Sequence, residues 1–177
     1  MKPCLFIAGA VALFSSSAIA GEHYLNAGAG FGSFDVKAKN AFASVKIKRS
    51  FQSANFTYGY QLNDYFGVEL KANFGLNKDK NLKNKSVTGL YLKGNYPIND
   101  SVNLYALFGR ASTKIQNDGD NASRSSFSYG LGTTYELSEK WAIGANYMLY
   151  HSSTEKAGPV DVKFDYTAFG IFAQYKF

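Results

Sequence analysis

The sequence predicts an all-β protein, an eight-stranded antiparallel up-and-down transmembrane β-barrel. Three observations predict this fold. Segments of roughly ten residues alternate large apolar side chains with small or polar ones, as strands do between lipid and a polar lumen. A tight-turn motif occurs three times along the chain. The last ten residues, 168–177, form an alternating aromatic strand that ends on Phe177, which suits the closing strand of a barrel.

The first twenty residues are predicted to be a targeting segment. Lys2 precedes the apolar run Leu5–Phe14, and Ala18–Ala20 has the small-x-small pattern of a cleavage site. The apolar run is shorter than the roughly 20 residues that a membrane-spanning helix needs. We therefore expect residues 1–20 to be a cleaved signal peptide and residues 21–177 to be an outer-membrane β-barrel domain.

Composition restricts the class of protein further. The one cysteine is Cys4, so residues 21–177 contain no disulfide. Mean hydropathy is −0.20, and no apolar run beyond the leader is long enough for a membrane helix. A barrel remains compatible, because only alternate residues of its strands face lipid. With two histidines and no cysteine beyond the leader, we predict no metal site and no cofactor.

The repeated motif predicts tight turns. It reads YQLNDYF at 60–66, YPINDSV at 96–102 and YELSEKW at 135–141. Asn, Asp and Ser favour tight turns because their side chains bond to nearby backbone. The repeating unit is therefore strand, tight turn, strand and longer connection. Three tight turns predict eight strands.

The first four strands are predicted at 23–34, 54–62, 65–76 and 87–96. The first alternates apolar outward residues with inward Gly28, Gly30 and Gly32. The second presents Phe56, Tyr58 and Tyr60 outward. The third and fourth present Phe66, Leu70, Phe74, Leu90 and Leu92 to lipid, with Glu69, Lys71, Asn73, Tyr91, Lys93 and Asn95 inward.

The last four strands are predicted at 102–113, 125–137, 141–151 and 164–177. Both faces of the fifth strand are apolar, so its sidedness is weak. Aromatic residues gather at the strand ends, which suits the girdle of a membrane barrel. A soluble lipocalin-like barrel also fits the alternation, but it has apolar residues inside. The face with the charges here is small and polar, and the other carries the large apolar groups.

The lumen is predicted to hold an ion-pair network. An eight-stranded barrel leaves an interior that side chains can fill. Its charged occupants are expected to be Glu69, Lys71, Lys93 and Glu136, with Glu69 opposite Lys93. An unpaired charge there would be costly, so pairing is favoured over a conducting pore.

Long connections at the other end carry positive charge. They are predicted at 35–53, 77–86, 112–124 and 152–163. The first two are basic through Lys37, Lys39, Lys46, Lys48, Arg49, Lys78, Lys80, Lys83 and Lys85. Such a patch attracts polyanions, either the phosphates of lipopolysaccharide, which we favour, or sulfated or phosphorylated host polymers. Nucleic acid is disfavoured by the compartment. The alternation of residues 45–48 (VKIK) also predicts that the second strand extends beyond the membrane.

One constellation could support catalysis. His151, Ser153 and Asp165 share the outward parity of the last two strands, and the hairpin is expected to place Ser153 roughly across from Asp165. A serine, a histidine and a carboxylate could form a hydrolytic triad. The simpler interpretation, which we favour, is a set of polar residues at headgroup level.

The Gly-rich first strand, GYQLNDYFGVEL at 59–70 and the terminal IFAQYKF resemble small outer-membrane barrels of the OmpX/Ail type and the OmpA transmembrane domain. The resemblance implies a monomer in the Gram-negative outer membrane with an adhesion or envelope-integrity role and no catalysis. It also implies assembly by the barrel-insertion machinery, which would recognise the terminal strand through Phe169, Ile171, Tyr175 and Phe177.

The possible triad resembles the PagL lipid A deacylases. His151-Ser152-Ser153 matches that family's His-x-Ser motif. Asp165 stands where the family has glutamate, and Thr154 replaces the asparagine that follows the serine. Lipid A deacylation is therefore the alternative function, and the resemblance would assign it to Ser153, His151 and Asp165.

Overall fold

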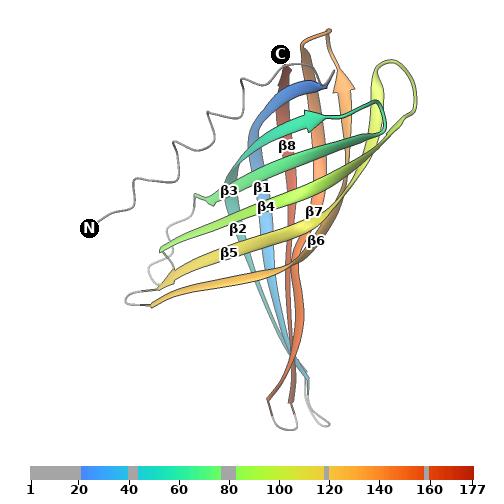
Figure 1. Ribbon diagram of the computed structural model, residues 1–177. Coiled ribbons are helices and arrows are strands. Elements are labelled where there is room, and N and C mark those ends of the chain that lie inside the picture. Colours follow the sequence, from blue (N-terminus) through green and yellow to red (C-terminus); the bar gives the residue numbers. More distant parts are fainter. Residues whose placement is uncertain (1–20, 40–43, 77–82, 118–119, 158–159) are drawn as a thin grey trace.

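The computed structural model describes residues 21–39, 44–76, 83–117, 120–157 and 160–177, and it describes side chains for 21–33, 50–76, 86–114, 125–150 and 166–177. The described chain forms a closed barrel of eight antiparallel strands in sequence order (Figure 1). The strands are β1 (Glu22–Lys39), β2 (Ser44–Gln61), β3 (Phe66–Gly75), β4 (Lys83–Pro97), β5 (Val102–Asn117), β6 (Asp120–Glu136), β7 (Trp141–Ala157) and β8 (Val160–Lys176). The predicted fold class is confirmed.

The three tight turns follow the repeated motif. Asn63 Oδ1 accepts hydrogen bonds from the amides of Tyr65 and Phe66, both at 2.9 Å. Asn99 Oδ1 accepts in the same way from the two amides two and three residues later. Ser138 Oγ accepts from the amide of Trp141 at 3.2 Å. A short side-chain acceptor at the same place in each repeat therefore caps each turn.

The terminal strand closes the barrel. β8 pairs with β7 on one side and with β1 on the other. At its end, the amide of Lys176 donates to the carbonyl of Lys140, and the amide of Phe177 donates to the carbonyl of His23. Both edges of the last strand are thus hydrogen-bonded, which removes the exposed edge that its aromatic residues would otherwise present.

Most of the predicted long connections are strand. β1 and β2 stay paired as far as Lys39 and Ser44, and β7 and β8 as far as Ala157 and Val160. The predicted boundaries are therefore wrong at this end of the barrel. The extension of the second strand predicted from residues 45–48 is confirmed, because β2 begins at Ser44. The end of β7 beyond Tyr150 is polar, and there the backbone hydrogen bonds to β8 mark the strand.

The barrel wall divides beyond the apolar belt. Pairing between β2 and β3 ends at Ser53 and Gly75, and pairing between β6 and β7 ends at Tyr129 and Leu149. Strands β7, β8, β1 and β2 continue as one sheet, while β4, β5 and β6 continue as another. Figure 1 shows the two groups of strands diverging from the barrel.

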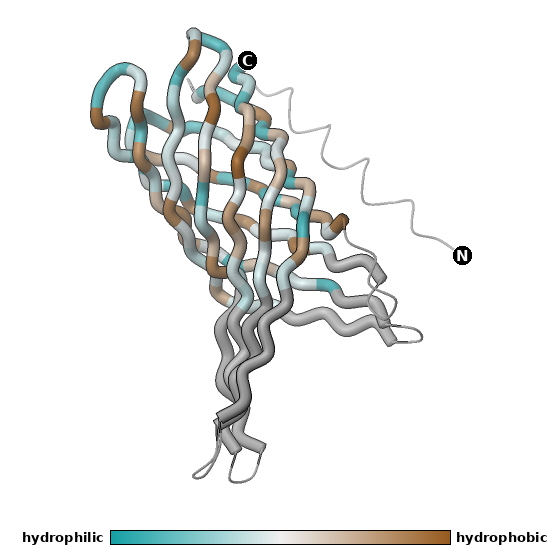
Figure 2. The backbone as a smooth tube through the Cα atoms, turned by 180° about the vertical axis from the view of Figure 1, so that it is seen from behind, coloured by the Kyte–Doolittle hydropathy of each residue, from teal (hydrophilic) through white to brown (hydrophobic). Residues whose placement is uncertain are grey.

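Large apolar side chains cover the outside of the closed part. Leu131, for example, is 69% exposed. Hydrophobic and hydrophilic residues alternate along the strands of the wall (Figure 2). Burial also shows which face of β5 points inward, because Tyr105 and Leu107 are buried while Leu104 and Phe108 are exposed. Within the described residues, no helix is long and apolar enough to cross a membrane. The outward belt is what lipid requires of a barrel.

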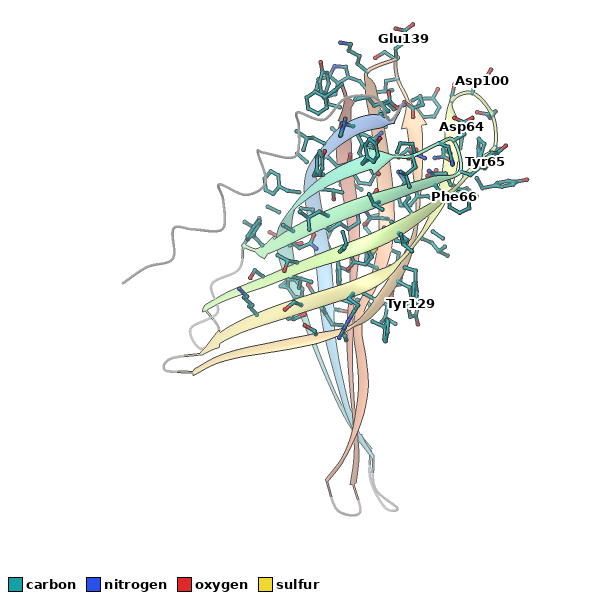
Figure 3. All side chains as sticks on the ribbon, viewed as in Figure 1. Asp64, Tyr65, Phe66, Asp100, Tyr129 and Glu139 are labelled. Atoms are coloured by element: carbon teal, nitrogen blue, oxygen red, sulfur yellow. The ribbon has the colours of Figure 1, made fainter. Side chains whose placement is uncertain are left out.

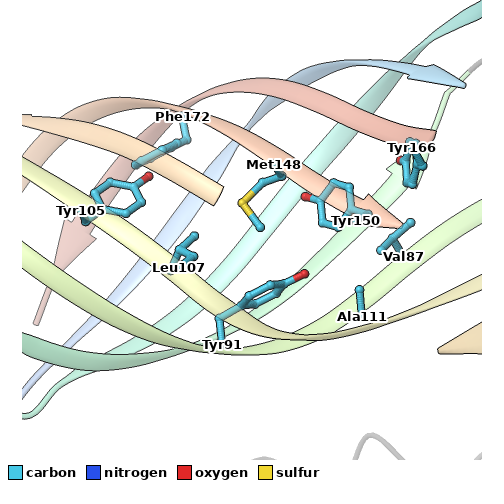
Figure 4. Packing of buried hydrophobic residues seen from close by; sticks show 9 residues of the cluster. All are labelled: Val87, Tyr91, Tyr105, Leu107, Ala111, Met148, Tyr150, Tyr166 and Phe172. Carbon is cyan, nitrogen blue, oxygen red and sulfur yellow. The ribbon is translucent and has the colours of Figure 1, made fainter. Parts of the chain in front are cut away.

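The lumen contains an aromatic and aliphatic core as well as charges. Nine buried residues from facing strands point into it (Figure 4): Val87, Tyr91, Tyr105, Leu107, Ala111, Met148, Tyr150, Tyr166 and Phe172. Tyrosine hydroxyls there are bonded: Tyr91 donates to Ser128 Oγ, and Tyr150 accepts from Asn73. The prediction that the lumen occupants are mainly charged is therefore incomplete, because buried Tyr combines packing with hydrogen bonding.

Gly109 of β5 lies where the backbone of β4 approaches closely. A Cβ there would overlap the carbonyl oxygen of Leu90 and lie 2.8 Å from Tyr91 Cα, whereas a Cβ at Gly94 would meet nothing within 4 Å. We expect Gly109→Ala to lower the free energy of unfolding by about 1–3 kcal/mol because backbone must move. Gly94→Ala should have no destabilising effect. Denaturant unfolding of the two folded variants measures the difference, and equal midpoints would contradict the close approach.

Candidate functional site

A buried cluster of charges lies in the lumen around Glu69 of β3. Lys71 Nζ lies 2.8 Å from Glu69 Oε2, and Lys93 Nζ of β4 lies 3.5 Å from Oε1. Tyr24 of β1 donates its hydroxyl to Oε1 at 2.6 Å. The side chains of the three charged residues are at most 5% exposed. The structure thus joins three of the four predicted network residues and adds a tyrosine that the sequence did not single out.

The cluster holds two ammonium groups for one carboxylate. Lys93 Nζ lies 4.7 Å from the centroids of both the Tyr24 and Tyr105 rings, and it donates to Tyr24 Oη at 3.0 Å. Lys71 Nζ donates to Thr57 Oγ1. Aromatic faces and hydroxyl groups therefore solvate the excess positive charge, as cation–π contacts do most strongly where water is excluded.

Two details of the predicted network are wrong. Glu69 lies opposite Tyr91, and Lys93 lies opposite Gly67, so the ion pair is diagonal across the inner face. A shift of one residue in the centre of the β3–β4 hairpin moves each cross-strand partner by two, which keeps the face but changes the neighbour. Glu136 lies outside the cluster, because its Oε1 pairs with Lys176 Nζ at 2.9 Å near the tight turns.

A polar mouth opens at the tight-turn end of the barrel. The cavity is about 410 Å³ and reaches inward to Tyr24 and Lys93. Asn103 Oδ1, Glu136 Oε2 and Gln174 Oε1, which lie in its walls, have no hydrogen-bond partner within the described protein. Asp64, Asp100 and Glu139 stand on three different turns at this end, and Tyr65 and Phe66 lie next to Asp64 (Figure 3). The turn end is therefore acidic and rich in acceptors, in contrast to the basic opposite end.

The basic residues predicted on two long connections lie on two different sheets. Lys37, Lys39, Lys46, Lys48 and Arg49 belong to β1 and β2, while Lys83 and Lys85 belong to β4. Lys78 and Lys80 lie outside the described residues. The register places Lys37 directly opposite Lys46 on β2 and directly opposite Lys163 on β8. We call these three residues the lysine row.

The residue opposite Asp165 differs by one position from the predicted Ser153. An irregularity between Leu149 and His151 shifts the pairing of β7 with β8, so Ser152 lies opposite Asp165 and Ser153 lies opposite Phe164. The side chains of residues 151–165 lie outside those described. The triad of His151, Ser153 and Asp165 therefore stays a prediction. Removal of an acyl chain from lipid A, measured by mass spectrometry and abolished by Ser153→Ala, would be its signature.

Among the described residues, no group of three His, Cys, Asp or Glu side chains could hold a metal ion.

The chain matches one known protein family over nearly its whole length. A family model described as "Outer membrane protein beta-barrel domain" matches residues 6–177. No match is found among curated proteins.

Solved structures show the same fold at low identity. OprG of Pseudomonas aeruginosa is 18% identical with a TM-score of 0.60, covering 91% of this chain and 98% of its own. The outer membrane protease OmpT of Escherichia coli is 7% identical with a TM-score of 0.55, covering 92% and 99%. Ail, the attachment invasion locus protein of Yersinia pestis, is 21% identical with a TM-score of 0.46, covering 86% and 98%. At these low identities, the two structures with TM-scores above 0.5 indicate a common architecture only.

Proposed function

Since the chain belongs to the outer-membrane β-barrel family, we propose that it is a non-enzymatic surface protein whose basic strand extensions bind polyanions outside the cell. In this proposal the signal peptide delivers the chain, and the barrel-insertion machinery recognises the terminal strand. The barrel then works as a monomer in the membrane. The tight, acidic turns face the periplasm and the long strand ends face the exterior, as in barrels with short periplasmic turns and long outer connections.

The lysine row is the observation that carries the proposal. Lys46, Lys37 and Lys163 occupy directly opposite positions on three adjacent strands. Neighbouring strands lie about 4.8 Å apart, so three lysine positions follow one another across about 10 Å of sheet. Like charges directly opposite each other destabilise a sheet. A linear polymer of sulfate or phosphate groups lying across the strands would neutralise them.

The ligand of this row is an anionic polymer of regular charge spacing. The phosphates of lipopolysaccharide present this chemistry at the membrane surface, and sulfated or phosphorylated polymers of a host surface present it in solution. The first source supports a role in envelope integrity and the second a role in adhesion. Binding from solution distinguishes the second source, because it needs no lipid.

A charge-matched pair of triple variants tests the proposal. We expect Lys37→Gln/Lys46→Gln/Lys163→Gln to weaken heparin binding by about tenfold, because each exposed ion pair contributes up to about 1 kcal/mol. Binding should also fall with added salt. The control, Lys83→Gln/Lys85→Gln/Arg124→Gln, removes the same charge from the other sheet. Surface plasmon resonance on the refolded protein measures both, and an equal loss in the two variants would refute a specific role for the row.

A further inference from the structure

Arg110 lies in the last apolar row of the outer wall. The register places Leu90 of β4 and Phe127 of β6 directly opposite it on its two sides. Leu90 and Phe127 are 63% and 68% exposed, as residues are that face lipid. The Arg110 side chain is also exposed, with its Cζ 5.7 Å from the centroid of the Phe127 ring. A guanidinium group therefore stands level with side chains that belong in hydrocarbon.

The outer wall becomes polar immediately beyond this row. The next outward position of β5 is Ser112, with Thr88 and Ser125 opposite it. The position after that is Lys114, which is exposed. Arg110 and Lys114 are four residues apart, about 13 Å along the strand. The outer face of β4–β6 thus passes from an apolar row containing arginine, through a hydroxyl row, to a second cation.

No carboxylate whose side chain is described lies beside these two cations. Of the carboxylates whose side chains are described, Glu69 lies in the lumen, and the others stand at the tight-turn end: Glu22, Asp64, Asp100, Glu136 and Glu139. The other sheet differs, because there Lys48 lies opposite Asp35. A cation at the hydrocarbon boundary is costly unless an anion meets it. An anion supplied from outside this chain would meet both cations.

We propose that Arg110 and Lys114 bind the two phosphates of an acylated, diphosphorylated glycolipid of the outer leaflet. Arginine suits the phosphate nearest the hydrocarbon, because its planar fork donates two parallel hydrogen bonds and it sheds water more readily than lysine. Two cations about 13 Å apart along the strand suit a headgroup with two separate phosphates better than a phospholipid with one. The acyl chains would lie over Leu90, Phe108 and Phe127, which are all exposed.

This site depends on the proposed orientation, with the long strand ends outside the cell, but not on the lysine row. The row lies on β8, β1 and β2, whereas Arg110 and Lys114 lie on β5. Heparin binding could therefore fail while the glycolipid site holds, and the reverse is equally possible. The two experiments share no variant position.

Native mass spectrometry of the folded protein in detergent tests the site. The probes are bis-phosphorylated lipid A, mono-phosphorylated lipid A and phosphatidylglycerol. We expect the wild type to bind bis-phosphorylated lipid A most tightly and Arg110→Gln to bind it about tenfold more weakly. Arg110→Lys, which keeps the charge but loses the fork, should be intermediate. Lys140→Gln, which removes an exposed lysine at the tight-turn end, should bind as the wild type does.

Two results would overturn the proposal. One is equal binding of bis-phosphorylated lipid A by the wild type and by Arg110→Gln/Lys114→Gln. The other is binding of phosphatidylglycerol as tight as that of lipid A, which would make the site one for anionic lipid in general. A heat-dependent gel shift of each variant verifies that it is folded. Because both residues are exposed, their replacement should leave the barrel intact.

Discussion

Replacing Glu69 with alanine is expected to lower the free energy of unfolding by about 3–5 kcal/mol, because it leaves two buried ammonium groups without their counter-ion. Lys71 and Lys93 both lie within 3.5 Å of the carboxylate, and neither side chain is more than 5% exposed. The Tyr24 hydroxyl would also lose its acceptor. Denaturant unfolding of the barrel refolded in phospholipid vesicles measures the loss.

Two further variants separate the ion-pair effect from a general effect of losing a carboxylate. Glu139→Ala removes an exposed carboxylate from a tight turn and should change stability by less than about 0.5 kcal/mol. Glu69→Leu/Lys71→Met/Lys93→Met removes the whole cluster, and it should recover most of the stability lost in Glu69→Ala, since apolar residues can replace a buried ion pair. If Glu69→Ala and Glu139→Ala unfold at the same midpoint, the cluster does not contribute to stability.

Placing an arginine at the middle of the outer belt is the second large perturbation. Leu131 lies at the centre of the outward run of β6 between Phe127 and Tyr135, and it is 69% exposed. In a bilayer, Leu131→Arg should cost about 2–4 kcal/mol, because the charge enters the hydrocarbon. Leu137, which is 59% exposed, lies in the tight turn just beyond β6. Leu137→Arg should cost only about 0–1 kcal/mol at the interface.

The two variants differ mainly in their depth in the membrane, since both replace leucine with arginine and the two leucines are similarly exposed. Reversible unfolding in vesicles measures both free energies. A barrel surrounded by water would tolerate both changes equally, because each side chain is already exposed. Equal costs for Leu131→Arg and Leu137→Arg would therefore contradict the placement of the belt in lipid.

Local sequence was sufficient for the elements of this fold. Alternation assigned Leu70 and Phe74 to the outside and Glu69 and Lys71 to the inside, because side chains of a strand alternate faces whatever its neighbours are. The three turns were predictable from Asn63, Asn99 and Ser138, since these side chains cap turns through bonds to backbone two or three residues away. Eight strands and closure then followed from the count.

Strand ends and lateral partners were not predictable in this way. Beyond Tyr150, β7 continues through polar residues without an apolar face, and its hydrogen bonds to β8 define it. β5 has apolar residues on both faces, and only closure of the barrel decided that Tyr105 and Leu107 point inward. Pairing depends on register, which one residue in a hairpin can shift, and patterning within a single strand contains no information about it.

The sequence by itself determined the class of protein: a membrane barrel with charged and polar residues inside, tight turns at one end and basic connections at the other. Each of these is a property of residues taken one strand at a time. The tertiary structure alone decided which charges meet. It joined Glu69 to Lys71, Lys93 and Tyr24, separated Glu136 from them, aligned three lysines across β2, β1 and β8, and left Arg110 beside Leu90 and Phe127. The physical reason is that electrostatic contacts depend on distances between strands, and those distances are set when the barrel closes.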